Sequence, residues 1–105
     1  MLYELRIYTA LEGRFDALRD RFRDYTLGLF KKHEMCVRDF WIDDEGHPRL
    51  YYMLEFRDKE DRTRKWDAFR ADPEWSKLIC KTQMDGPIVA KIEEILMKRA
   101  DFFRL

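Results

Sequence analysis

The chain has 105 residues, of which 46% are hydrophobic, 40% charged and 15% aromatic, and 21 basic side chains balance 21 acidic ones. This apolar fraction is too high for a disordered segment, and the length fits a single domain over residues 1–105. A net charge of zero argues against a nucleic-acid-binding module, which needs many unpaired Lys and Arg side chains. No uninterrupted apolar run approaches the roughly 20 residues needed to span a bilayer, so no membrane span is predicted.

The N-terminal residues and the two cysteines bear on the cellular compartment. Glu4 is acidic where the basic region of a secretory signal would lie, so no such signal is expected. Cys36 and Cys80 are too few and too isolated for a disulfide framework or a zinc site. We interpret them as buried or partly buried thiols, and we predict a cytoplasmic protein.

The first third of the chain predicts a strand followed by one helix. Residues 2–9 alternate between an apolar face and a mixed face and are rich in aromatic side chains, which is typical of a strand. Residues 14–33 predict a helix, because apolar residues recur there every three or four positions: Phe15, Leu18, Phe22, Tyr25 and Leu29.

Two strands and two helices are predicted next. Met35–Asp43 is a strand that ends in an acidic turn, and Leu50–Arg57 has large apolar side chains on both faces, so we expect it to be buried on both sides. Asp58 is placed to be the N-cap of a helix that contains Trp66 and Phe69. Asp72 followed by proline is typical of the start of a further helix.

The last segment, residues 86–103, fits either a helix or a strand. Helix propensity favours the first, whereas the alternation of Ile88, Ala90 and Ile92 fits the second. A helix would leave a three-stranded sheet with an exposed edge, and a strand completes the order βαββαβ. We therefore predict an α+β ferredoxin-like fold, with a four-stranded antiparallel sheet and helices on one face.

The open face of this sheet is predicted to contain Tyr8, Tyr51 and Met53, with Arg6 and Glu55 among them. Such a surface is poorly suited to water, and we predict a homodimer in which the two open faces meet. Charged side chains enclosed there must be paired, so Arg6 and Glu55 are interpreted as an ion pair or, alternatively, as a polar anchor for a small molecule.

Five short motifs resemble the NIPSNAP family in order and approximate spacing along nearly the whole chain. They are Tyr3-Glu4-Leu5-Arg6-Ile7-Tyr8, Lys32-His33, Phe40-Trp41, Leu54-Glu55-Phe56 and Asp72-Pro73-Glu74-Trp75. The resemblance implies the dimeric α/β-barrel architecture that small cofactor-independent monooxygenases and some haem enzymes share, and it implies no particular reaction. Glu34 stands where the family usually has glycine, so we do not expect the family's turn geometry at that position.

Few side chains indicate catalysis. We interpret His33 as a residue that caps the end of a helix and His47 as a solvated loop residue, and we predict no metal, haem or other cofactor. Aromatic residues could line a flat ligand cleft between sheet and helices, although their spacing also fits an ordinary core. The candidate binding residues are Arg6, Tyr8, Trp41, Tyr52, Glu55, Trp66 and Trp75.

Three functions are compatible with these patterns. The leading one is a homodimeric domain that binds a small molecule or a protein partner. The alternative is a cofactor-independent monooxygenase or isomerase acting on a small aromatic or lactone-like substrate. The third is a purely structural oligomerisation module. A cavity of about 300 Å³ or more with convergent polar groups would favour the first two over the third.

Overall fold

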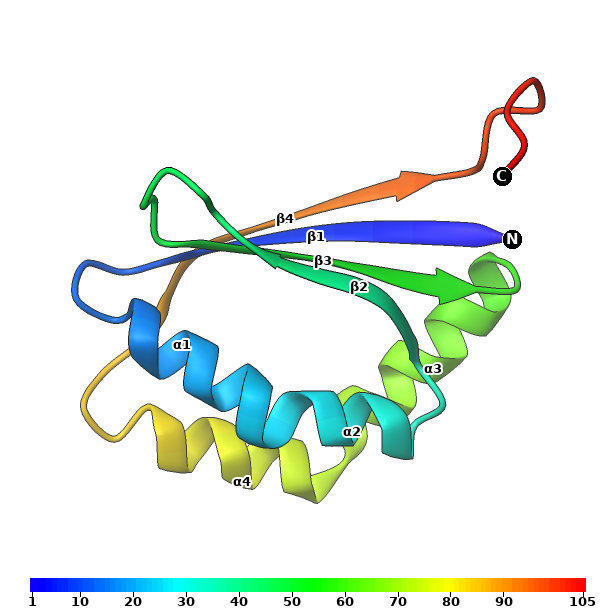
Figure 1. Cartoon of the computed structure of the whole chain (residues 1–105). Helices are drawn as coiled ribbons and strands as arrows, with labels where there is room; N and C mark the ends of the chain where they lie inside the picture. The colour runs from blue at the N-terminus through cyan, green and yellow to red at the C-terminus, as the bar shows by residue number, and fades with distance from the viewer.

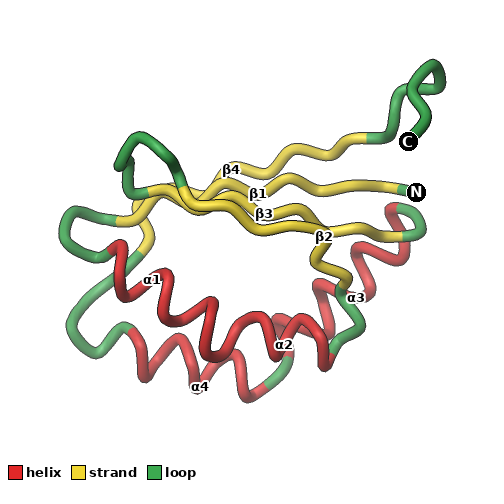
Figure 2. The backbone as a smooth tube through the Cα atoms, in the orientation of Figure 1, coloured by secondary structure: helices red, strands yellow, loops and turns green.

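Helices cover one face of a four-stranded sheet in the computed structural model, which describes residues 1–105 (Figures 1 and 2). The elements are β1 (Leu2–Ala10), α1 (Phe15–Arg21), the π-helical turn η1 (Phe22–Thr26), α2 (Leu27–Lys32), β2 (Cys36–Ile42), β3 (Arg49–Phe56), α3 (Lys59–Ala71), α4 (Pro73–Thr82) and β4 (Val89–Met97). The strand order is β2-β3-β1-β4, and every neighbouring pair is antiparallel. The predicted βαββαβ order is confirmed.

The final element is a strand, as the topology of the sheet required. β4 pairs with β1 from Tyr3 opposite Met97 to Ala10 opposite Val89, with one irregularity of register next to Ala10. Local helix propensity is therefore overridden by the ladder of hydrogen bonds that β1 offers at its free edge. Beyond β4, the last residues leave the sheet on the side away from the helices (Figure 1).

Both predicted N-caps are confirmed. The Asp58 carboxylate accepts a hydrogen bond from the backbone N–H of Asp61 at 2.7 Å at the start of α3. The Asp72 carboxylate accepts one from the N–H of Glu74 at 2.9 Å, with Pro73 at the first position of α4. These bonds satisfy N–H groups that no helical carbonyl can reach.

The long helix predicted over residues 14–33 is present, but it contains a π-helical turn that changes its buried face. The backbone N–H of Leu27 donates to the carbonyl of Phe22, five residues earlier. This turn holds one more residue than an α-helical turn. Thr26 and Phe30 are therefore buried, whereas Tyr25 is 46% exposed, and its predicted place in the apolar stripe is wrong.

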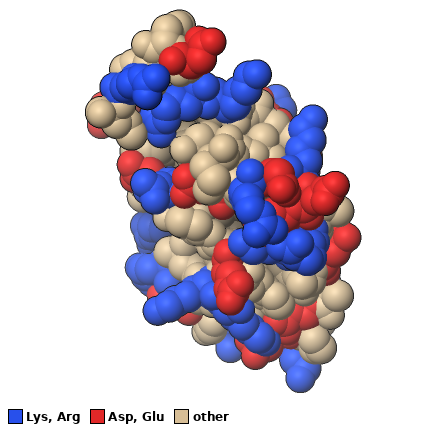
Figure 3. Space-filling view, turned by 90° about the vertical axis from the view of Figure 1, so that its right-hand side faces the viewer, with Lys and Arg blue, Asp and Glu red and all other residues tan.

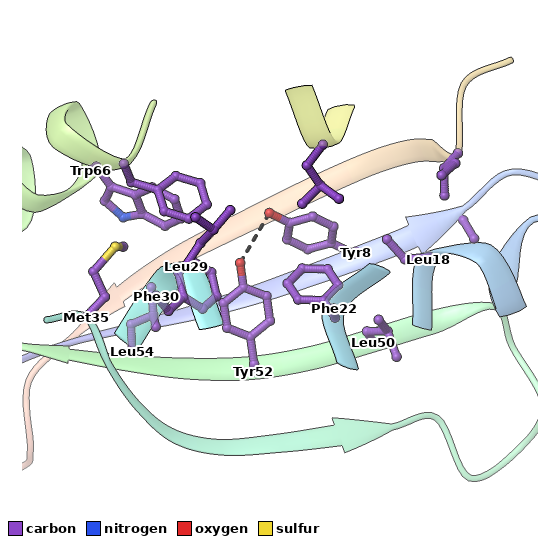
Figure 4. Close-up of a cluster of buried hydrophobic side chains, with 14 of the residues drawn as sticks. Tyr8, Leu18, Phe22, Leu29, Phe30, Met35, Leu50, Tyr52, Leu54 and Trp66 are labelled. Atoms are coloured by element: carbon purple, nitrogen blue, oxygen red, sulfur yellow. Dashed lines mark hydrogen bonds between the residues drawn. The ribbon is translucent and has the colours of Figure 1, made fainter. Parts of the chain in front are cut away.

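Aromatic rings fill most of the space between the sheet and the helices (Figure 4). The Phe40 and Tyr52 rings of two neighbouring strands stack at 5.2 Å with an angle of 10° between their planes. Phe30 of α2 contacts both Tyr52 and Trp66 of α3, at centroid distances of 5.6 and 5.9 Å. Each such pair contributes about 0.5–1.5 kcal/mol beyond the area that it buries.

The two faces of β1 are the reverse of what its sequence predicts. Arg6 lies opposite Tyr52, whose side chain is fully buried under the helices, and Tyr8 lies opposite the buried Leu50. Arg6 and Tyr8 therefore face the helices, and their predicted position on the open face is wrong. Tyr3, Leu5 and Ile7 lie on the open face instead.

The strand β3 is buried on its helix-facing side only. Tyr51, Met53 and Glu55 lie on the open face, as predicted, and each is partly exposed in this chain. The predicted burial of β3 on both sides is therefore not found in this chain, because no element covers the open face.

Two local expectations are not met. Glu34 adopts a left-handed conformation with φ of 57°. The N–H of Glu34 donates to the carbonyl of Lys31, and the N–H of Met35 donates to the carbonyl of Phe30. This is the hydrogen-bond pattern with which a glycine commonly ends a helix, so the turn geometry is retained without the glycine. Cys36 and Cys80 are both exposed free thiols rather than buried ones.

The charges of the protein are interspersed. On the face shown in Figure 3, Lys and Arg side chains lie next to Asp and Glu side chains rather than forming a patch of one sign. No helix combines the length and the apolar composition that are needed to cross a bilayer.

Candidate functional site

A buried carboxylate lies at the centre of the polar residues between sheet and helices. Glu4 is 0% exposed, and both of its oxygens are hydrogen-bonded. Oε1 accepts from Arg62 Nε at 2.8 Å and from Trp66 Nε1 at 2.9 Å, and Oε2 accepts from Arg6 Nη1 at 2.8 Å and from Arg62 Nη2 at 3.1 Å. Burial alone would raise the pKa of Glu4, but bonds from Arg62, Trp66 and Arg6 outweigh it and lower the pKa, so the group is ionised at neutral pH.

Arg6 is the second member of this cluster and joins three strands of the sheet. Its Nη1 also donates to Glu94 of β4 at 2.8 Å, while Nε donates to the Tyr52 hydroxyl and Nη2 to the Tyr8 hydroxyl, both at 3.0 Å. Burial would lower the pKa of Arg6, yet its interactions with Tyr52, Tyr8 and Glu4 raise the pKa instead. The guanidinium remains charged and is held in one orientation.

The charges of this cluster balance. Two carboxylates, from Glu4 and Glu94, face two guanidinium groups, from Arg6 and Arg62. A buried ionic cluster of this kind is tolerated because each charge has a partner and each lone pair of Glu4 has a donor.

Next to this cluster is a cavity of about 260 Å³ between the sheet and the helices. Residues from β1, η1, α2, α3, α4 and β4 line it: Arg6, Tyr8, Thr26, Phe30, Trp66, Phe69, Arg70, Trp75 and Ile92. Exposed Arg70 and Ile92 mark its mouth, while Arg6, Tyr8 and Phe30 lie in the interior. The volume does not reach the expected 300 Å³, so the polar groups and not the size distinguish this cavity from a packing void, and the space suits a molecule of about one ring.

Arg6, Tyr8 and Arg70 supply this cavity with hydrogen-bond donors, whereas Thr26 offers only an acceptor oxygen. The Tyr8 hydroxyl accepts bonds from Arg6 Nη2 and from the Tyr52 hydroxyl, which lies 3.2 Å away (Figure 4). A tyrosine hydroxyl has one proton besides its two lone pairs, so the Tyr8 proton is free for another acceptor. Thr26 uses its own proton on the carbonyl of Arg21 at 3.3 Å.

The structure brings together most of the sequence-predicted site residues. Arg6, Tyr8, Trp66 and Trp75 line the cavity, and Tyr52 lies directly behind Tyr8 and Arg6. The other two candidates, Trp41 and Glu55, lie outside the cavity.

Trp41 and Glu55 belong to the open face of the sheet. Trp41 pairs with Tyr51 of β3 and is 43% exposed, and Glu55 pairs across the strands with Cys36 and lies 3.6 Å from Arg38. The predicted Arg6–Glu55 ion pair is therefore wrong, because adjacent strands place residues of this register on opposite faces. Arg6 pairs with Glu4 and Glu94 instead.

The most important residues that sequence reasoning missed are the other members of the ionic cluster. Glu4, Arg62 and Glu94 were not among the candidate binding residues. The positions of Glu4 and Arg6 at i and i+2 of one strand, which share a face, were the available signal. Their partners lie 58 and 88 residues further along the chain, where no local pattern could identify them.

The two histidines have structural partners. His33, at the end of α2, lies 2.7 Å from the carboxylate of Asp72, which also contacts Lys32 at 2.7 Å, so it ties α2 to the start of α4. His47 lies 3.1 Å from Asp43 within the loop between β2 and β3. No group of three or more His, Cys, Asp and Glu side chains is arranged to hold a metal ion.

The fold and these motifs agree with one family. The NIPSNAP family model matches residues 3–104. This chain belongs to the NIPSNAP family. The resemblance inferred from the five motifs is confirmed, since the match covers nearly the whole chain.

Solved NIPSNAP structures share this architecture. An uncharacterized NIPSNAP domain protein from Burkholderia xenovorans superposes with a TM-score of 0.84 at 22% identity, over 99% of each chain. A NIPSNAP family protein from Agrobacterium tumefaciens has a TM-score of 0.84 at 17% identity, covering 96% of this chain and 94% of that one. A crystal structure of an antibiotic biosynthesis monooxygenase has a TM-score of 0.63 at 14% identity, over 95% and 99% of the two chains, and shows the shared ferredoxin-like fold. None of the curated proteins matches this NIPSNAP chain.

Proposed function

We propose that this NIPSNAP domain is a homodimeric small-molecule-binding protein that holds its ligand in the cavity between sheet and helices. The observation that carries the proposal is the cavity itself, which places a rigid set of donors next to aromatic walls. Arg6 and Tyr8 are fixed by several hydrogen bonds each, so little conformational entropy is lost when they bind a ligand. A purely structural module would gain nothing from leaving this space open.

The chemistry of the cavity favours binding over turnover. Proton abstraction from a substrate requires a basic group within hydrogen-bond reach. The nearest carboxylate, that of Glu4, has a lowered pKa and is bonded at both oxygens, and no carboxylate or imidazole lines the cavity. A cofactor-independent monooxygenase or isomerase would have to operate here without a protein base, which makes it the less favoured alternative.

The open face of the sheet supports the dimer. It combines large apolar side chains from all four strands, of which several are half-exposed: Tyr3, Leu5, Ile7, Trp41, Tyr51, Met53, Ile95 and Met97. A contiguous apolar surface of this size on a small protein is typical of a protein interface. Two open faces in contact would bury it, with an expected total area on the order of 1,600 Å².

The ligand-binding part of the proposal is tested by nuclear magnetic resonance with a library of neutral and charged fragments. Trp66 and Trp75 line the cavity, whereas Trp41 lies on the other face of the sheet and serves as an internal control. Fragments that bind in the cavity should shift the indole signals of Trp66 and Trp75 but not that of Trp41. The variant Ile92→Trp, which fills the mouth from the edge strand, should abolish these shifts. A library that shifts neither indole signal contradicts the proposal.

The dimer is tested by light scattering coupled to size-exclusion chromatography. We expect twice the mass of the 13.0 kDa chain at micromolar concentration. A stable monomer under these conditions would remove the dimer from the proposal and leave the cavity untouched.

A further inference from the structure

We infer that the ligand of this cavity is a small organic anion, a carboxylate on a flat aromatic or conjugated body, held between the Tyr8 hydroxyl and the guanidinium groups of Arg6 and Arg70. The inference rests on the proposed ligand-binding function and specifies the chemical class of the ligand. It is carried by three features of the cavity: its surplus of donors, its unpaired cations and its aromatic walls.

Two donors of the cavity have no hydrogen-bond partner in the protein. Arg6 uses four of its five N–H groups on Tyr52, Tyr8, Glu4 and Glu94, and the remaining one is on Nη2, next to the Tyr8 hydroxyl. The free proton of Tyr8 lies beside it. Two adjacent donors of this kind match the two oxygens of a carboxylate.

Arg70 adds an unpaired positive charge at the mouth. It is exposed, it makes no ion pair, and its guanidinium lies 5.0 Å from the centroid of the Trp66 ring. The indole of Trp66 thus holds Arg70 over the mouth, while Arg6 lies 4.5 Å from the same ring. Because the cluster around Glu4 is neutral as a whole and no carboxylate lies within ion-pair distance of Arg70, Arg70 adds a positive charge at the mouth.

Arg21 is a second unpaired cation, and it is buried behind the wall of the cavity. It is only 4% exposed, faces no carboxylate, and its Nε has no hydrogen-bond partner. Its Nη1 donates to Thr82 at 3.3 Å, and its guanidinium lies 6.0 Å from the ring of Trp75, a lining residue. An isolated buried cation is costly to keep, and a bound anion close by would compensate it.

The walls determine the body of the ligand. Rings of Phe30, Trp66, Phe69 and Trp75 line a space of about 260 Å³, which admits a ring of six atoms with one short substituent. Flat rings offer their faces to a flat partner, so a planar acid fits better than a branched aliphatic one.

Benzoate and its neutral isostere benzamide test the inference with the indole signals described above. Benzoate should shift the Trp66 and Trp75 signals with saturation and leave Trp41 unchanged, and it should bind at least tenfold more tightly than benzamide. The variant Arg70→Gln should weaken the binding of benzoate at least fivefold and leave the binding of benzamide unchanged. Lys77→Gln removes an exposed cation of α4 outside the cavity. It is the matched control and should change the affinity for neither probe.

Arg21 provides a second and independent readout. Arg21→Met removes a buried charge that lacks an ionic partner, so the urea midpoint of the ligand-free protein should stay the same or rise. The same variant should lower the affinity for benzoate more than the affinity for benzamide. A residue with only a structural role would lower the urea midpoint without changing this selectivity.

The outcomes separate the inference from the function on which it rests. If benzamide binds as tightly as benzoate, or if Arg70→Gln and Lys77→Gln behave alike, the anionic ligand is overturned while the cavity remains a binding site. If neither probe nor any fragment shifts Trp66 and Trp75, both the inference and the proposed function are overturned.

Discussion

On one face of β1, Glu4 and Arg6 lie in the interior of the protein, whereas Leu5 and Ile7 on its other face remain partly exposed. The usual distribution of polarity is thus reversed between two faces of a single strand. On the inner face, the charged side chains pair with one another and direct donors toward a cavity. On the open face, apolar side chains of neighbouring strands lie next to one another.

Burial in β1 follows the availability of partners rather than the polarity of a side chain. Glu4 is buried because three side chains of β1 and α3 donate four hydrogen bonds to it. Leu5, its neighbour in the chain, has no protein layer above it. A substitution scan of β1 should therefore give results opposite to those for an ordinary amphipathic strand.

The largest effect is expected for Glu4→Leu on the inner face. The substitution is apolar and of similar size, yet it leaves Arg6 and Arg62 without their buried counter-ion, and we expect a loss of about 3–5 kcal/mol in the free energy of unfolding. Urea denaturation measures it. Glu12→Gln, at an exposed carboxylate of the loop after β1, is the control and should stay within about 0.5 kcal/mol. The double variant with Arg6→Leu should recover much of the loss, and additive losses would show that the two residues are not coupled.

The next effect is expected for Leu5→Glu on the open face. A charge at the centre of the proposed interface should weaken dimerisation at least 100-fold, which is about 2.8 kcal/mol, while the far-ultraviolet circular dichroism of the protomer stays unchanged. Sedimentation equilibrium measures the dissociation constant. Ser76→Glu on the exposed side of α4 introduces the same charge and should leave the dimer intact. Equal dissociation constants for the two variants would separate this face from assembly.

A smaller effect is expected for Tyr52→Phe, which tests how much the hydroxyl network supports Arg6. The variant keeps the ring that stacks on Phe40 but removes the acceptor of Arg6 Nε, which becomes a buried donor without a partner. We expect a loss of about 1–2 kcal/mol by urea denaturation. Tyr25→Phe, at an exposed hydroxyl, should change stability by less than about 0.5 kcal/mol. Similar losses in both variants would indicate that the network adds nothing to stability.

The smallest effect is the dependence of stability on pH. The pKa of Glu4 is lower in the folded protein than in the unfolded chain, so its ionisation stabilises the fold above the unfolded-chain pKa of about 4.3. This stabilisation should disappear as the pH falls through the folded pKa, so the urea midpoint should decrease below about pH 5. The decrease should be shallower in Glu4→Gln. If the urea midpoint falls equally in both proteins, the acid sensitivity belongs to other carboxylates, such as Asp72. The pKa of Asp72 is lowered by hydrogen bonds from Lys32, the Glu74 N–H and His33.

Much of the fold could be predicted because its signals are local. The caps at Asp58 and Asp72 identify helix starts by themselves, and the topology of the sheet decided the ambiguous last strand. The faces of β1 could not be assigned in this way, because the donors that make burial of Glu4 favourable come from Arg62 and Trp66, in a helix that is distant in the chain. Trp66 and Trp75 could be named as candidates because large aromatic side chains in the helices face the sheet, whereas Trp41 lies on the open face and shows that residue type alone does not decide the position.

The π-helical turn η1 has a consequence for how such a chain can change in length. A turn with a hydrogen bond from residue i+5 to residue i is equivalent to an α-helix with one inserted residue. Leu18 and Phe22 anchor the helix before the insertion, and Leu29 and Phe30 anchor it afterwards. We therefore expect that deletion of one residue from this turn restores regular α-helix and leaves both anchors in place. Because Thr26 lines the cavity, such a deletion would change the shape of the cavity more than the packing of the core.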